Sequence, residues 1–201
     1  SARNMPPRLI AYTILQDAQD GNVIYLGTFS KILAPGFRLG WIVAAPEALE
    51  TLLHAKQPSD LHTGMAQQMA TWQVASSDNF VDRHVERIKA FYRERRDTML
   101  RAIEQHFPAD AHYTRPAGGL FVWAELPQHI DTRDLLLEAV QDKVAFVPGQ
   151  GFHCDHGGAN TMRLNFSNVP PEALQEGIRR LGNAIQRRLG RAARSEPSVT
   201  I

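Results

Sequence analysis

Apolar and polar positions follow two different periods along this chain, which predicts a mixed α/β protein. Short apolar runs with β-branched and aromatic residues predict strands, and apolar positions every three or four residues predict helices. The expected strands are residues 23–29, 39–44, 111–114, 120–126, 145–147 and 161–166. The expected helices are residues 46–57, 63–75 and 79–107, followed by two that begin at Thr132 and Pro171. Residues 58–60 should break the first helix, because Pro58 lacks an amide hydrogen.

The order of these elements predicts two parts and a tail. Residues 1–75 combine two strands with two helices, and residues 76–190 form a smaller layer of short strands interleaved with helices. Met65, Met69 and Trp72 share one helical face, a pattern typical of core or subunit contact. Residues 191–201 lose the helical period, which predicts a flexible tail.

Composition and charge exclude several classes of protein but do not indicate a binding partner. The chain has 201 residues, 43% apolar, and 22 Lys and Arg balance 21 Asp and Glu. Disordered and fibrous classes are excluded, and so is a chain built to coat a polyanion. No apolar run approaches the roughly 18 residues of a membrane span, and the N-terminus lacks a secretory signal pattern. The single cysteine, Cys154, agrees with a reducing compartment, so a cytoplasmic location is expected.

The chemistry centres on the segment between the first two expected strands. Lys31 follows an apolar strand, and Arg38 lies seven residues later across a loop with Pro and Gly. A lysine that leaves a buried strand can be a desolvated amine, which is a nucleophile toward aldehydes. Arg38, Thr28 and Ser30 could then bind one phosphate through a guanidinium and two hydroxyls. Taken alone, however, a lysine after a strand is most often an ordinary surface residue.

The segment TFSKILAPGFRLG (residues 28–40) resembles the cofactor-lysine motif S/T-x-S-K-x-x-x-P-G-x-R-x-G. That motif belongs to fold-type I pyridoxal-phosphate enzymes, in the class I/II aminotransferase group. The resemblance implies that Lys31 holds pyridoxal 5'-phosphate as a Schiff base. It also implies that Thr28, Ser30 and Arg38 contact the cofactor phosphate.

Three later segments are similar to the same family in type and in order. They are PAGGLFVW (116–123), VPG (147–149) and NTMRLNFS (160–167). By this resemblance Arg163 clamps the substrate α-carboxylate, a role that suits the planar fork of a guanidinium. Without the lysine motif, an ordinary cross-strand charge pair would be the preferred interpretation of Arg163.

The resemblance spans about residues 20–190 and implies a fold class. That class is α/β, namely the end of a fold-type I aminotransferase large domain followed by the complete small C-terminal domain. The family's Asp-x-x-Tyr segment is not found in residues 1–19, so we expect a C-terminal fragment of a protein roughly twice as long. The parent is expected to be a homodimeric amino-acid aminotransferase acting on amino acids and 2-oxo acids. The isolated chain is expected to be inactive.

The sequence is also compatible with other functions. One alternative is the aminotransferase-like effector domain of a winged-helix transcriptional regulator, and another is a binding or dimerisation module without turnover. Neither the amino acid nor the acceptor can be identified. The loop of residues 153–156 has ligand-type side chains but no second pair at zinc-site spacing, so no metal is expected. The arginines of residues 179–194 lack interleaved aromatic residues, which makes nucleic-acid binding an unfavoured interpretation.

Overall fold

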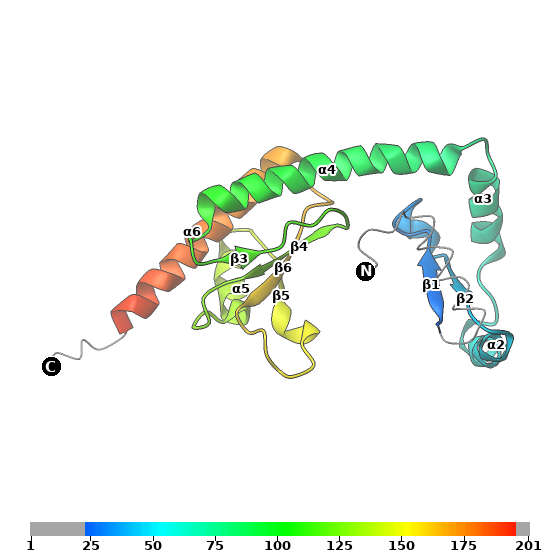
Figure 1. Cartoon of the computed structure of the whole chain (residues 1–201), viewed down its shortest axis with the longest axis horizontal. Coiled ribbons are helices and arrows are strands. Elements are labelled where there is room, and N and C mark those ends of the chain that lie inside the picture. Colours follow the sequence, from blue (N-terminus) through cyan, green and yellow to red (C-terminus); the bar gives the residue numbers. More distant parts are fainter. Residues whose placement is uncertain (1–22, 196–201) are drawn as a thin grey trace. The chain divides into compact units, whose positions relative to one another are not determined.

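The computed structural model describes residues 23–195, and Figure 1 shows the order of its elements. The chain divides into two compact units, residues 1–87 and 88–201. The division falls inside helix α4 (Phe80–His106), whereas the sequence predicts a boundary near residue 76. The assignment of residues 76–190 to one small domain therefore stays a prediction.

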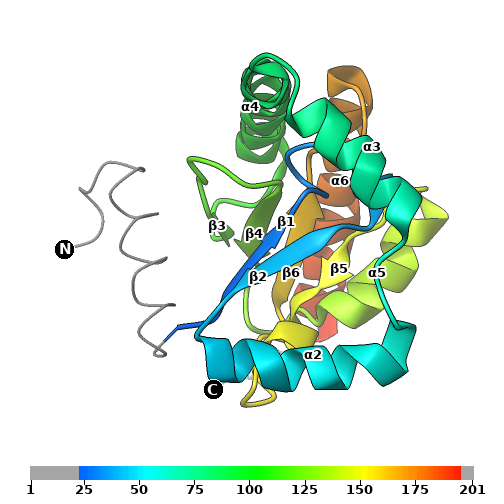
Figure 2. The same cartoon turned by 90° about the vertical axis from the view of Figure 1, so that its right-hand side faces the viewer.

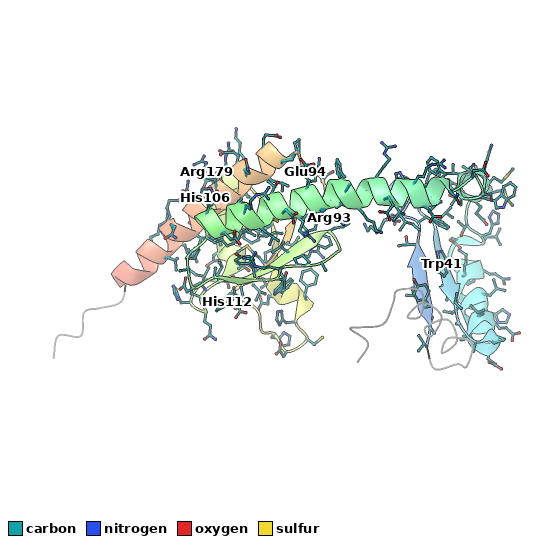
Figure 3. All side chains as sticks on the ribbon, turned by 45° about the horizontal axis from the view of Figure 1, so that its top comes forward. Trp41, Arg93, Glu94, His106, His112 and Arg179 are labelled. Carbon is teal, nitrogen blue, oxygen red and sulfur yellow. The ribbon has the colours of Figure 1, made fainter. Side chains whose placement is uncertain are left out.

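The first unit contains a strand pair and two helices. Its elements are β1 (Tyr25–Thr28), the 3-10 turn η2 (Pro35–Phe37), β2 (Gly40–Val43), α2 (Pro46–Asp60) and α3 (Met65–Ala75). β1 and β2 are antiparallel, with Gly27 opposite Trp41 and Thr28 opposite Gly40. A Cβ atom on Gly27 would overlap the Trp41 ring, so the glycine lets this ring, labelled in Figure 3, lie across the strand.

Helix α2 continues through Pro58, so the predicted break at residues 58–60 is wrong. Pro58 removes one backbone hydrogen bond from the last turn, and neighbouring side chains support this turn. The Ser59 hydroxyl donates to the Ala55 carbonyl at 2.9 Å, and Lys56 pairs with Asp60 at 2.8 Å. The helix ends when the Leu61 amide donates to the Gln57 carbonyl with Leu61 at φ 59.

The helices of the first unit leave apolar side chains exposed among the described residues. Met65, Met69 and Trp72 on α3 are 62%, 63% and 72% exposed. They are therefore not core residues in the described part of the chain. Their expected role as a subunit contact stays a prediction.

The second unit is a four-stranded antiparallel sheet covered by helices. After α4 its elements are β3 (His112–Tyr113), β4 (Phe121–Glu125), α5 (Thr132–Gln141), β5 (Val147–Pro148), the 3-10 turn η3 (Gly149–Phe152), β6 (Thr161–Asn165) and α6 (Pro171–Ser195). The strand order is β3-β4-β6-β5, with the two-residue strands at the edges. Pro148 is compatible with β5 because an edge strand has one side free of ladder hydrogen bonds.

One face of this sheet forms the core with the helices. Every second residue of the central strands is buried, as Val122 and Ala124 show on β4 and Met162 and Leu164 on β6. α5 and α6 lie on that side of the sheet (Figure 2). The buried apolar cluster runs from Met99 to Ile185 and lies entirely in the second unit. None of the described helices is long and apolar enough to cross a membrane.

Helix α6 extends to Ser195, beyond residue 191 where the sequence predicts a tail. Ion pairs to α5 explain the extra length, since Arg188 contacts Asp134 at 2.6 Å and Glu138 at 2.7 Å. Arg191 adds a contact to Glu138 at 3.3 Å. Residues 196–201 of the predicted tail lie outside the described part of the chain.

Candidate active site

The residues of the lysine motif lie in one turn between β1 and β2. The Phe29 amide donates to the Leu39 carbonyl at 3.0 Å, which continues the strand pairing into the turn. The Thr28 hydroxyl donates to the same carbonyl at 3.2 Å and accepts the Ser30 amide at 3.1 Å. A hydroxyl hydrogen can rotate, so Thr28 can turn its donor toward an incoming oxyanion. Thr28 and Ser30 are thus brought together at the start of the turn.

Arg38 closes the turn from the other side. Its backbone is left-handed at φ 53, and its amide donates to the Pro35 carbonyl at 3.3 Å. Its guanidinium makes one long contact of 3.5 Å to the same carbonyl and pairs with no carboxylate among residues 23–195. The exposed fork is therefore available to an anion.

Lys31 is exposed, and the residues described here do not desolvate its amine. The sequence predicts a buried strand before it, but β1 alternates between intermediate and exposed residues, and Leu26 is 70% exposed. The amine makes no hydrogen bond or ion pair to any residue of the described part. Within residues 23–195, no partner therefore blocks the access of an aldehyde to this amine.

Arg163 occupies the centre of the second unit's sheet. It lies in β6 with Trp123 of β4 as its Cα partner on one side and Val147 of β5 on the other. Phe121, two residues before Trp123, projects to the same face because strand side chains alternate. That face is opposite the one that Val122 and Leu164 bury in the core.

The guanidinium of Arg163 is surrounded by rings instead of acids. Its Cζ atom lies 4.2 Å from the centroid of Phe121 and 4.8 Å from that of Phe152. Its Nε atom is buried and has no hydrogen-bond partner. Within residues 23–195 it forms no ion pair, which argues against an ordinary cross-strand charge pair. A buried donor without a partner is costly, and an incoming carboxylate could satisfy it.

Phe152 reaches Arg163 because η3 packs closely on β6. A Cβ atom on Gly149 would lie 2.9 Å from the backbone carbon of Thr161 and would overlap its side chain. Only glycine allows this approach, which explains why η3 begins with the glycine of the VPG segment. The Trp123 ring meets the Phe152 ring edge to face, with centroids 5.5 Å apart.

Phe121 and Phe152 are not among the site residues predicted from the sequence. For Phe121 a signal exists, because the period of two along β4 places it on the face of Trp123. For Phe152 no sequence signal exists, because its place depends on how closely η3 approaches β6. That approach follows from tertiary packing.

The loop of residues 153–156 is organised by a local turn. The Asp155 carboxylate accepts the Gly157 amide at 3.0 Å, and this hydrogen bond lowers the pKa of Asp155. No group of three His, Cys, Asp or Glu side chains that could hold a metal occurs among residues 23–195. The exposed Cys154 is not part of a disulfide.

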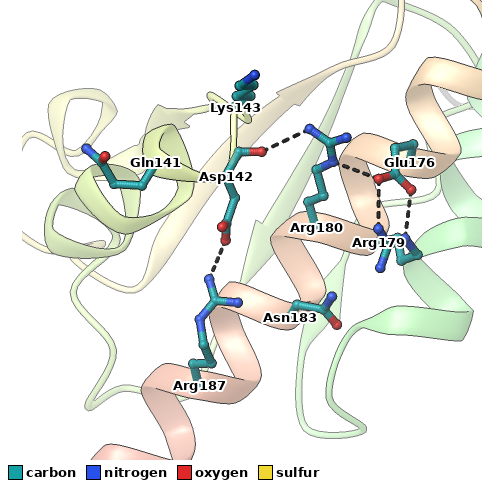
Figure 4. Close-up of a pocket in the computed structure, with 8 residues that line it drawn as sticks. All are labelled: Gln141, Asp142, Lys143, Glu176, Arg179, Arg180, Asn183 and Arg187. Atoms are coloured by element: carbon teal, nitrogen blue, oxygen red, sulfur yellow. Dashed lines mark hydrogen bonds and ion pairs between the residues drawn. The ribbon is translucent and has the colours of Figure 1, made fainter.

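A polar hollow of about 360 Å³ lies between the end of α5 and α6 (Figure 4). Glu176 contacts Arg179 and Arg180 at 2.7 Å each, and these bonds lower the pKa of Glu176 to about 2. Asp142 pairs with Arg187 and also accepts Arg180 through its carbonyl. The arginines in this hollow are therefore neutralised by carboxylates of the same unit, and the network joins α5 to α6.

A comparison with protein families decides the identity of the fold. The model described as aminotransferase class I and II matches residues 5–181 of this chain. The chain belongs to this aminotransferase family.

Other aminotransferases share much of this sequence and structure. Aromatic-amino-acid aminotransferase 1 of Thermococcus litoralis is 49% identical over 168 residues, covering 84% of this chain and 40% of that protein. LysN, the α-aminoadipate aminotransferase of Thermus thermophilus, is 42% identical with a TM-score of 0.83, covering 89% of this chain and 46% of that one. The multiple substrate aminotransferase of Thermococcus profundus is 46% identical with a TM-score of 0.81, covering 85% and 42%. This chain thus spans less than half the length of these aminotransferases.

These aminotransferase structures confirm the α/β fold class predicted from the sequence. Pyridoxal phosphate is the cofactor of class I and II aminotransferases, and the LysN structure holds a phosphopyridoxyl-leucine adduct. The motif residues of this chain fit such a group by their chemistry. Lys31 offers a free amine, and Thr28 and Arg38 offer donors that a phosphate can use.

Proposed function

We propose that this chain belongs to an amino-acid aminotransferase that transfers an amino group from an amino acid to a 2-oxo acid. The observation that carries the proposal is the Arg163 guanidinium, which lies over two rings without an acidic partner among the described residues. Both substrates of such a reaction carry a carboxylate beside the reacting carbon. A planar guanidinium fork can bind both oxygens of that carboxylate and orient the reacting carbon.

In this proposal the lysine turn binds the cofactor. Arg38, Thr28 and Ser30 would hold the phosphate, which would keep the cofactor bound independently of Lys31. When bound, pyridoxal phosphate supplies an electron sink for the bonds at the substrate Cα. The freed Lys31 amine would take the proton from the substrate Cα as a general base and deliver it to the cofactor C4′ as a general acid.

Substitution of Arg163 in the complete enzyme tests the proposal. We expect Arg163→Ala to weaken kcat/KM for amino acids by about 2 to 5 kcal/mol, because a desolvated bidentate charge pair is lost. The amine with the same side chain but no carboxylate should change little. Arg93→Ala, an exposed position on α4 labelled in Figure 3, is the control and should leave both substrates unaffected. Equal losses for the amino acid and the amine would mean that Arg163 has a structural role instead.

A regulator is the second candidate, because an HTH-type transcriptional regulator of Bacillus subtilis, YdfD, is 31% identical over 175 residues. This similarity covers 87% of the chain and 36% of the regulator, and it is weaker than that to the aminotransferases. A regulator would bind the amino acid without producing a 2-oxo acid. Measuring 2-oxo acid formation by the complete protein distinguishes the two functions.

We also propose that the complete protein is a cytoplasmic homodimer. The exposed Met65, Met69 and Trp72 on α3 support a subunit contact, because large apolar side chains gathered on one helix favour burial against protein. The unpaired Cys154 agrees with a reducing compartment. Sedimentation of the complete protein and of its Trp72→Ser variant tests the dimer, since loss of this side chain should weaken association.

A further inference from the structure

We propose that Phe152 is a positioning residue that holds the Arg163 guanidinium in place for the substrate carboxylate. This inference rests on the proposed function of Arg163. Phe152 lies in η3, which is separate in sequence from β4 and β6, and its ring centroid is 4.8 Å from Cζ of Arg163. Phe121 supports the same guanidinium from β4 at 4.2 Å.

The position of the Phe152 ring is determined by its neighbours, although the residue is 50% exposed. Trp123 meets it edge to face with an interplanar angle of 85°. Gly149 brings the start of η3 against Thr161 of β6, only two residues from Arg163. The packing of η3 on β6 therefore sets the separation between the ring and the guanidinium.

An aromatic ring and a carboxylate that contact an arginine differ in which hydrogen-bond donors of the guanidinium remain unoccupied. A cation over a ring is attracted to its electron-rich face, whereas the N–H groups at the edge of the guanidinium keep their hydrogen-bonding capacity. A carboxylate partner would occupy that edge and would have to be displaced by the substrate. The buried and unpaired Nε of Arg163 agrees with the first arrangement. Phe152 therefore orients the guanidinium without competing for the ligand.

A different role for the ring would be to line the pocket for the substrate side chain. The two roles predict different selectivity. A lining residue affects an amino acid and the matching amine alike, because both have the same side chain. A positioning residue affects only the substrate with a carboxylate.

The experiment compares Phe152→Leu with Phe152→Tyr in the complete enzyme. We expect the leucine variant to raise KM for amino acids and 2-oxo acids about 3- to 30-fold, the range of a partly desolvated cation–π contact. kcat and the KM of the matching amine should change less than about twofold, because the contact acts only on carboxylate binding. The tyrosine variant keeps an aromatic face and should restore the original KM.

Phe91→Leu is a matched control within the same unit. Its ring lies 3.3 Å from Cζ of Arg95 on α4, so it removes a similar ring from another arginine. This variant should leave the KM for every substrate unchanged. If Phe152→Leu fails to fold, Phe152→Met provides the same comparison with an unbranched side chain of similar size.

A second measurement needs neither cofactor nor turnover. In the 201-residue chain, NMR of the Arg163 Nε–H group should show faster hydrogen exchange in Phe152→Leu than in the original chain or in Phe152→Tyr.

An unchanged KM and exchange rate would overturn the inference, and so would equal losses for amino acid and amine. If Arg163→Ala itself is not selective for the carboxylate, the proposed function fails. If only Phe152→Leu is not selective, this inference alone fails.

Discussion

Arg163 differs from the arginines of α6 in what surrounds its guanidinium. Arg179 and Arg188 contact carboxylates within hydrogen-bonding distance, and these contacts stabilise helices. Arg163 contacts two phenyl rings and leaves its polar edge unpaired among the described residues. At the scale of single residues, the lack of an acidic partner distinguishes the arginine proposed to bind substrate from the arginines that join helices.

Lys31→Ala in the complete enzyme should abolish the covalent attachment of pyridoxal phosphate. The reason is that no other lysine lies in the motif of residues 28–40. The measurement is borohydride reduction followed by mass spectrometry of the labelled peptide, together with the visible absorption of the bound cofactor. Lys56→Ala, on α2 and paired with Asp60, is the control and should keep both signals. A cofactor still fixed to the Lys31→Ala chain would assign the attachment to another residue.

The sequence proposes the individual polar residues of the candidate site, and their roles stay predictions. Thr28, Ser30 and Arg38 were proposed from the motif, and the turn gathers them around the end of β1. The exposure of Lys31 and the ring contacts of Arg163 could not be predicted, because burial and ring packing depend on residues distant in sequence.

At the scale of elements, α6 contains two glycines in opposite environments. A Cβ atom at Gly177 would meet nothing within 4 Å, whereas one at Gly182 would lie 2.5 Å from the His106 carbonyl oxygen. Gly177 also lines an apolar hollow of about 220 Å³ beside Leu164. Gly182 therefore allows the end of α4 to approach α6 closely.

We expect Gly177→Ala to raise the free energy of unfolding by about 0.5 to 1 kcal/mol, since alanine lowers the entropy of the unfolded helix segment. Gly182→Ala should lower it by about 1 to 3 kcal/mol through overpacking against α4. Urea unfolding of the 201-residue chain, followed by circular dichroism, measures both. Destabilisation of similar size in both variants would contradict this difference in packing.

The Glu176→Gln substitution should make the Tm of the chain depend less on pH. Hydrogen bonds from Arg179 and Arg180 lower the pKa of Glu176 to about 2 from its ordinary 4.5. A depressed pKa stabilises the folded state above the unfolded value, and this contribution is lost as pH falls from 4.5 toward 2. The Tm of the variant should therefore be lower than that of the original chain at pH 7, and the two should converge as the pH approaches about 2.

The exposure of Glu176 makes this effect small and sensitive to salt. Glu94→Gln, at an exposed position on α4 labelled in Figure 3, is the control and should show no such convergence. A Tm difference that stays constant as the pH is lowered from neutral through this range would mean that the charge of Glu176 is not involved.

The type of an element could be predicted where the hydrophobic pattern continues over many residues. Helix α4 is an example, since it is expected at residues 79–107 and lies at Phe80–His106. Local rules failed where tertiary contacts override them. α2 passes Pro58, and ion pairs with α5 extend α6 to Ser195. β5 is only two residues long, because pairing with β6 sets its length more than its composition does.

At the scale of the whole molecule, buried apolar side chains are distributed unequally among the described residues. The buried apolar cluster belongs to the second unit, whereas α2 has no buried residue among those described. We expect hydrogen exchange of the 201-residue chain to be slowest in β4, β6 and α6 and fastest in β1, β2 and α2. Mass spectrometry of peptides from both units measures this. Equal protection in the two units would show that the first unit is stabilised independently of that cluster.

The pairing of β4 with β6 has a consequence for the fidelity of folding. Trp123 pairs with Arg163, and Val122 pairs with the buried Leu164. A shift of β6 by one residue would turn the Arg163 cation into the apolar interior and expose Leu164 to water, since alternate residues exchange faces. Burial of an unpaired charge is strongly unfavourable, so a misregistered chain would lose its fold together with the proposed carboxylate site. A stable but incorrectly paired form, able to accumulate without activity, is therefore disfavoured by the same arginine that is proposed to bind the substrate.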